Sequence, residues 1–155
     1  MIAEELRTAI KGSEFIVKDI NAPDVFIPEE YTEEQNMIYG MCRDFLNQEV
    51  FPNLDRIDAL EEGLMPSLLD KAGALGLLGL SIPAQYGGME MGFVSSQLVA
   101  EATGAGNAFA VAISAHCGIG TLPILYYGNE VQKEKYLPKL ATGEWKACYC
   151  LTEPN

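Results

Sequence analysis

Hydrophobic residues recur at helical spacing through most of the chain. Thr32 and Gln35 have the spacing of a capping box, which predicts the start of a long helix that bends near Pro52. A second helix is expected between Pro66 and Gly76. The side chains expected to face inward from these two helices are Met37, Ile38, Met41, Phe45, Leu46, Val50, Leu68, Leu69, Ala72 and Leu75.

The next long stretch, residues 93–127, contains a single charged residue, Glu101. A helix that is apolar on nearly all sides belongs in the centre of a domain, so this composition predicts buried central helices. Many of its residues are small and would let neighbouring helices approach closely. Asn107 is expected to cap the junction between two of these helices.

Asn129 and Gln132 repeat the capping-box spacing and predict the start of a last, charged helix. Pro138 should distort or end this helix, because proline removes a backbone donor. The residues expected to face inward from it are Val131, Tyr136, Leu137 and Leu140.

Near the N-terminus, Ile2, Leu6 and Ile10 recur every four residues, which predicts a short helix that ends at Gly12. Phe15–Val17 is expected to be extended. The whole pattern predicts an all-α fold, an up-and-down bundle of about five or six helices with short connections.

The final residues change character. In residues 148–152, the apolar Tyr149 and Leu151 alternate with cysteine and threonine at the two-residue period of a strand. A lone strand leaves its backbone groups unpaired, so we expect a sheet-containing domain to follow Asn155. The expected division is an N-terminal extension (1–30), a helical domain (31–145) and the start of a β-domain (146–155).

The composition limits the possible partners. A net charge of -12, without a cluster of basic residues, argues against binding nucleic acid or an anionic membrane surface. The apolar run Phe109–Cys117 is too short to span a bilayer, and the residues after Met1 do not resemble a signal peptide. The paired Gly87 and Gly88 indicate a tight turn rather than a phosphate-binding loop.

The chain has four cysteines, Cys42, Cys117, Cys148 and Cys150, without the spacing of a metal site or a disulfide framework. We expect reduced thiols and a cytoplasmic location. The single histidine, His116, cannot make a histidine-rich metal site, and we expect a hydrogen-bonded core or capping residue rather than a general base.

Four segments in the same order resemble the N-terminal domain of acyl-CoA dehydrogenases. They are Pro83–Gly88, His116–Ile124, Gly128–Glu144 and Cys150–Asn155. The N-terminal extension up to Phe26–Glu30 is similar to the branch of the family that handles long and very long acyl chains.

The resemblance implies an enzyme with a helical domain, a middle β-domain and a C-terminal helix bundle, assembled as a homodimer or homotetramer. It implies FAD as cofactor, acyl-CoA as substrate and an electron-transferring flavoprotein as electron acceptor. Such an enzyme oxidises acyl-CoA to trans-2-enoyl-CoA in fatty acid β-oxidation. The positions implied to bind the flavin are Tyr149, Cys150, Leu151, Thr152, Glu153, Pro154 and Asn155, with the Thr152 hydroxyl on the pyrimidine edge.

The resemblance also implies that the catalytic base is a glutamate of the C-terminal domain. We therefore expect no catalytic residue in this chain, and neither Glu101, a buried or interface acid, nor Glu153, a structural residue of the turn, is assigned that role. By itself the chain is expected to be inactive. The alternatives are an acyl-CoA oxidase, or a free-standing helical module that dimerises or binds an acyl chain without chemistry.

Overall fold

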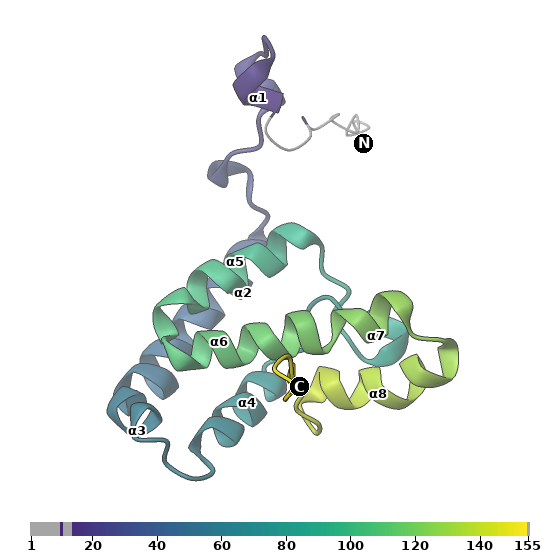
Figure 1. Cartoon of the computed structure of the whole chain (residues 1–155). Coiled ribbons are helices and arrows are strands. Elements are labelled where there is room, and N and C mark those ends of the chain that lie inside the picture. The colour runs from purple at the N-terminus through teal and green to yellow at the C-terminus, as the bar shows by residue number, and fades with distance from the viewer. Residues whose placement is uncertain (1–9, 11–13, 155) are drawn as a thin grey trace.

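The computed structural model describes residue 10 and residues 14–154, and these are helical with no strand among them (Figure 1). The all-α prediction is confirmed. Short 3-10 and π turns join the helices, including η3 (Leu46–Val50), η6 (Gly104–Gly106) and η7 (His116–Gly120). The α-helices are α1 (Glu14–Val17), α2 (Glu33–Phe45), α3 (Leu54–Asp58), α4 (Leu64–Ala74), α5 (Phe93–Thr103), α6 (Ala108–Ala115), α7 (Leu122–Tyr127) and α8 (Glu130–Thr142).

Both predicted capping boxes are present. The Thr32 hydroxyl accepts from the backbone N–H of Gln35 (3.2 Å), and the Gln35 side chain accepts from the Thr32 N–H (2.9 Å). Asn129 and Gln132 make the same reciprocal pair at the start of α8. These bonds satisfy backbone donors that a helix N-terminus leaves unpaired, so local chemistry alone fixes where both helices begin. After α2 the chain stays helical through Pro52 to the end of α3.

One large hydrophobic cluster joins α2, α4, α5 and α6. The Phe45 and Phe109 rings meet at its centre, with centroids 5.6 Å apart. Burying each such side chain stabilises the fold by about 1.5–3 kcal/mol. The buried members of the cluster are Ile38, Cys42, Phe45, Leu46, Val50, Ile57, Leu68, Leu69, Ala72, Leu77, Leu78, Leu80, Val99, Ala102, Phe109 and Ile113.

A second cluster lies under α8, where Leu137, Leu140 and Ala141 pack against Ile82 and Tyr86. α8 continues past Pro138 to Thr142, so of the two predicted outcomes, distortion or an end of the helix, an end at Pro138 is wrong. Proline in a helix interior costs about 3 kcal/mol. The burial of residues on both sides of Pro138 offsets that cost.

Two glycines fix the end of α8 against α4. Gly143 ends the helix in the left-handed conformation, with φ of 78°, which glycine adopts without steric cost. At Gly73 of α4, an added Cβ would collide with the carbonyl group of Thr142. The backbones of the two helices therefore approach too closely for any side chain at this position.

The stretch from Ala108 to Tyr127 is less buried than its composition predicts. It forms a helical run of 20 residues, and an 18-residue window within this run has mean hydropathy 1.7 and is 22% buried. By length and composition alone this run could cross a membrane, because it extends beyond Cys117, where the apolar run that is too short to span a bilayer ends. A core helix can have the same length and hydropathy, and here Phe109 and Ile113 are buried in the first cluster. The prediction of a helix buried on all sides is wrong for the described residues.

Other side chains also differ from expectation. Met37 (71% exposed), Leu75 (39%) and Val131 (74%) were expected to face inward, but lie at the surface because neighbouring elements cover only one side of each helix. Glu101 is also exposed, so of the two expectations for it, a buried acid is wrong and an interface acid stays a prediction. Asn107 occupies the predicted junction with φ of 51°, but its side chain makes no capping hydrogen bond.

The N-terminal extension differs as well. Phe15–Val17 belongs to α1 rather than to an extended segment, and α1 stands clear of the helix bundle in Figure 1. The Lys18 ammonium pairs with Glu14 at the favourable four-residue helical spacing. The short helix predicted for the first twelve residues lies outside the described residues, apart from Ile10.

Candidate functional site

Residues 148–154 follow α8 and its exit turn as a segment without regular structure. Tyr149 (56% exposed) and Leu151 (71%) are open to solvent, and Thr152, Glu153 and Pro154 are exposed as well. The predicted strand is not formed in the described residues, because a strand requires a hydrogen-bonded neighbour. Six of the seven predicted flavin-binding residues thus lie consecutively on one exposed segment, and the seventh, Asn155, lies outside the described residues.

The segment carries a row of hydrogen-bonding groups. Within the described residues, no hydrogen bond involves the backbone N–H groups of residues 149–153 or the Thr152 hydroxyl. Backbone and hydroxyl groups of this kind suit the pyrimidine ring of a flavin, which presents both carbonyl oxygens and a ring N–H. The donor set of this chain therefore fits one edge of that cofactor.

His116 holds the chain at the point where this segment begins. The backbone N–H of Ala147 donates to Nδ1 of His116 (3.1 Å), while Nε2 lies 3.0 Å from the carbonyl oxygen of Leu140. Since a backbone N–H can only donate, Nδ1 is the acceptor and the proton sits on Nε2. His116 is fully buried, and this burial lowers its pKa, with a smaller contribution from the charge of Lys146. The prediction of a hydrogen-bonded core histidine is confirmed.

The other side of the same π turn, η7, faces a hollow of about 400 Å³. Cys117 and Gly118 of η7 line one side of the hollow, and α5 lines the other with Ser96, Gln97 and Ala100. η7 thus borders the hollow with some residues and contacts Ala147 with others. The five residues of η7, His116–Gly120, thus contact both the hollow and the start of the exposed terminal segment.

The hollow is built for binding rather than for proton transfer. No acid or base is among its lining residues, and its polar groups include a hydrogen bond of 3.0 Å between the hydroxyls of Ser81 and Ser96. Burial raises the pKa of the Cys117 thiol to about 12, so this thiol stays protonated and is not a nucleophile at neutral pH. The arrangement suits an apolar chain with a few polar contacts.

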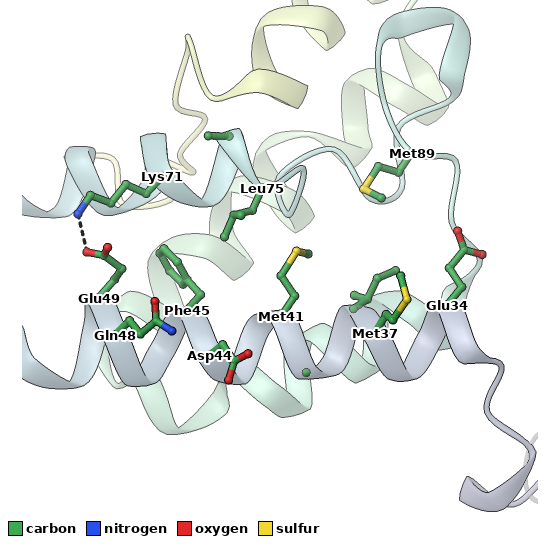
Figure 2. A pocket seen from close by; sticks show the side chains of 13 residues that line it. Glu34, Met37, Met41, Asp44, Phe45, Gln48, Glu49, Lys71, Leu75 and Met89 are labelled. Carbon is green, nitrogen blue, oxygen red and sulfur yellow. Dashed lines mark hydrogen bonds and ion pairs between the residues drawn. The ribbon is translucent and has the colours of Figure 1, made fainter.

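A second, wider groove of about 890 Å³ runs between α2 and α4. Figure 2 shows three methionines along it, Met37 and Met41 from α2 and Met89 from the loop above them. At one end, Lys71 of α4 pairs with Glu49. The groove brings together none of the residues predicted to bind the flavin.

All four thiols are free, as predicted. Cys148 and Cys150 lie close enough that a hydrogen bond between them raises the pKa of Cys148. No group of three or more histidine, cysteine, aspartate or glutamate side chains in the described part of the chain could hold a metal ion. The exposed segment therefore offers hydrogen-bonding groups and thiols, but no metal site.

The sequence did not single out Ser96, Gln97 or Ala100 as lining residues. They belong to the uncharged stretch 93–127, in which composition alone does not show which side of each helix is covered. The available signal was the polar run Ser95–Gln97 in the first half of α5. That Ser96 faces the hollow could not be predicted from α5 alone, because its hydrogen-bond partner Ser81 comes from the loop after α4.

Comparison with known proteins identifies the helical part of the chain. Residues 32–144 match the family model of the acyl-CoA dehydrogenase N-terminal domain. A probable acyl-CoA dehydrogenase of Bacillus subtilis is 40% identical over 154 residues, which are 99% of this chain and 26% of that protein. Another acyl-CoA dehydrogenase of Bacillus subtilis is 41% identical over 125 residues, 80% of this chain and 33% of that protein.

A crystal structure of an acyl-CoA dehydrogenase complexed with FAD, from Bacillus anthracis, superposes with a TM-score of 0.87 at 47% identity. The match covers 94% of this chain and 25% of that one. The chain thus spans about a quarter to a third of the length of these relatives. It belongs to the acyl-CoA dehydrogenase family, and residues 32–144 are its N-terminal domain.

Proposed function

We propose that this chain forms the helical wall of the flavin and acyl-thioester site of an FAD-dependent acyl-CoA dehydrogenase, which oxidises acyl-CoA to trans-2-enoyl-CoA. One observation carries the proposal. The π turn η7 borders the apolar hollow through Cys117 and Gly118, and it holds the start of the exposed segment through His116. The same π turn thereby contacts both the hollow proposed for the acyl chain and the segment proposed for the cofactor.

The residues of this chain have separate roles in the proposal. The hollow lined by Ser96, Gln97 and Ala100 receives part of the acyl chain, whose burial contributes to affinity in proportion to its apolar area. When bound, FAD would supply the acceptor for the hydride leaving the β-carbon. Donors from the segment 149–153, including the Thr152 hydroxyl, would hold its pyrimidine edge and stabilise negative charge there.

The base that takes the α-proton is not proposed within this chain. Glu101 and Glu153 are both exposed and line neither the hollow nor the groove between α2 and α4. A general base must lie within hydrogen-bond reach of the proton that it removes. We assign these two acids no catalytic role.

The proposal extends to partners, domain organisation and location. It includes an electron-transferring flavoprotein as electron acceptor, a homodimer or homotetramer, and residues 146–155 as the start of a β-domain. The exposed apolar face of α6 and α7, with Val111 (70% exposed) and Tyr127 (89%), is consistent with burial against other parts of such an assembly. A cytoplasmic location and a preference for long acyl chains are further parts of the proposal.

The test compares Thr152→Ala with Thr142→Ala in the FAD-containing protein. Thr142 is also exposed, but its hydroxyl bonds to carbonyls of its own helix, so it is the matched control. Loss of the bond at Thr152 should weaken FAD retention, or slow flavin reduction by acyl-CoA, on the order of tenfold. Thr142→Ala should leave both unchanged.

Unchanged FAD content and reduction rate in Thr152→Ala would refute the role given to this segment. The electron acceptor separates the dehydrogenase from the oxidase. Rapid peroxide formation with oxygen, without electron transfer to an electron-transferring flavoprotein, would replace the dehydrogenase assignment by an acyl-CoA oxidase.

A further inference from the structure

We propose that His116 is a positioning residue, whose buried neutral imidazole fixes the point where the chain leaves the helix bundle and thereby sets the register of residues 148–152 on the flavin. The inference rests on the function proposed above and assigns a role that none of the flavin-contacting residues fulfils. It is carried by the hydrogen bonds and packing around His116.

The imidazole joins the π turn η7 to the end of α8 and to the exit of the chain, which lie 24 and 31 residues further along the sequence. Nε2 contacts the carbonyl of Leu140 in the last turn of α8, and Nδ1 accepts from Ala147, one residue before the exposed segment. The carbonyl of His116 accepts from the Thr121 hydroxyl (2.6 Å), which holds the π turn itself. Both ring nitrogens are therefore used, and rotation of the ring would break both of their bonds.

Packing reinforces the hydrogen bonds at the same place. A Cβ added at Gly120, the last residue of η7, would collide with the Cβ of Ala147. The turn and the exit of the chain are thus in direct contact, so a displacement of one moves the other. Ala147 is half-buried, whereas every residue described beyond it is exposed.

Surface contacts guide the exit turn before Ala147, but they are open to solvent. The backbone N–H of Trp145 donates to the carbonyl of Lys139 (3.1 Å), and Lys146 pairs with Asp70 of α4. Exposed ion pairs contribute little to rigidity. The His116 side chain is fully buried, its bond to Leu140 is buried and its bond from Ala147 is part-buried, so these contacts constrain where Cys148 begins more strongly than the exposed ion pair does.

The two hydrogen bonds of His116 can be separated by substitution. In His116→Asn, the side-chain oxygen takes the place of Nδ1 and keeps the acceptor for Ala147, while the contact to Leu140 is lost. In His116→Gln, the amide nitrogen takes the place of Nε2 and keeps the donor to Leu140, while the Ala147 N–H loses its acceptor. Both substitutions leave a neutral polar residue in the same site.

The first experiment measures amide exchange and histidine tautomer by NMR on the 155-residue chain at pH 7.5. In the unsubstituted chain, His116 should be neutral with its proton on Nε2. His116→Gln should speed exchange of the Ala147 amide on the order of tenfold, and His116→Asn should leave it protected. Ile57→Val, in the core of α3, is the control for a general loss of stability and should not change this amide selectively.

The second experiment measures FAD dissociation and flavin reduction potential in the FAD-containing protein. His116→Gln should speed FAD dissociation severalfold and shift the potential, whereas His116→Asn should stay close to the unsubstituted protein. Gly120→Ala, which displaces Ala147 while keeping the imidazole, should resemble His116→Gln. If His116→Gln does not fold, His116→Asn still decides between anchoring and simple packing, because it changes the packing of the side chain but keeps the acceptor for the Ala147 N–H.

Failure of FAD binding can be distinguished from failure of the role of His116. If the longer protein that the proposed function implies, with this chain unsubstituted, binds no FAD, the proposed function fails, and amide exchange in the 155-residue chain still decides whether His116 anchors the segment. If FAD binds and His116→Gln frees the Ala147 amide without changing dissociation or potential, the positioning role is overturned. A charged His116, or a proton on Nδ1 at pH 7.5, overturns the anchoring itself.

Discussion

Replacing glycine by alanine at two helical positions should change stability in opposite directions. Gly40 lies within α2 and Gly73 within the last turn of α4. Alanine is favoured over glycine in a helix by about 0.8–1.0 kcal/mol. If helix propensity alone governed stability, both substitutions would stabilise the protein.

The surroundings of the two glycines differ. A Cβ at Gly40 meets nothing within 4 Å, so Gly40→Ala should raise the free energy of unfolding by about 0.5–1 kcal/mol. A Cβ at Gly73 collides with the main-chain carbonyl of Thr142, which cannot turn away as a flexible side chain could. Overpacking of this kind costs about 1–3 kcal/mol, and a backbone obstacle favours the upper end. The expected net loss for Gly73→Ala is about 2 kcal/mol.

Urea unfolding followed by far-ultraviolet circular dichroism measures both effects. With a slope of about 2 kcal/mol/M, the midpoint should rise by about 0.25–0.5 M for Gly40→Ala and fall by about 1 M for Gly73→Ala. A Gly73→Ala protein as stable as the unsubstituted one would refute the close contact between α4 and the end of α8. A destabilised Gly40→Ala would refute the open space beside α2.

Three more outcomes are expected. A thiol reagent should react quickly with the exposed Cys148 and Cys150 and slowly with the half-buried Cys117, while the fully buried Cys42 should react only after unfolding. Burial raises the pKa of Cys42 to about 11 and that of Cys117 to about 12, and four fast thiols would contradict the packing. Because its folded-state pKa is lowered, His116 contributes stability that is present above its unfolded pKa of about 6.5 and is lost as pH falls below it. Burial is the main cause of this lowered pKa, and the charge of Lys146 adds to it. Between pH 7.5 and 5 the urea midpoint should therefore fall less in His116→Gln than in the unsubstituted protein. An equal fall in both proteins would contradict a lowered pKa of His116. Purified alone, the chain should be colourless, since the segment proposed to face the flavin is open to solvent, and a stoichiometric yellow complex would contradict this prediction.

The parts of the fold set by local chemistry could be predicted from the sequence. The capping boxes at Thr32 and Asn129 depend on residues three positions apart, and both appear in the structure. Pro138 shows the limit of local rules, because burial of Leu137 and Leu140 keeps α8 intact where proline alone would end it.

The parts set by distant contacts could not be predicted in this way. Composition marked residues 93–127 as apolar, but which sides are covered depends on α2, α4 and the loop after α4. The hydrogen bonds of His116 to Leu140 and Ala147 join residues 24 and 31 positions away, and no periodicity in the sequence reveals such pairs. A strand at residues 148–152 likewise depends on a neighbour outside the local pattern.

The most direct test of the account is an anaerobic titration of the FAD-containing protein with acyl-CoAs of graded chain length. We expect the flavin to be reduced and one trans-2-enoyl-CoA to form for each flavin, with a preference among chain lengths. A protein that retains no FAD, or whose FAD stays oxidised with every acyl-CoA, would contradict the assignment of this helical domain to an acyl-CoA dehydrogenase site.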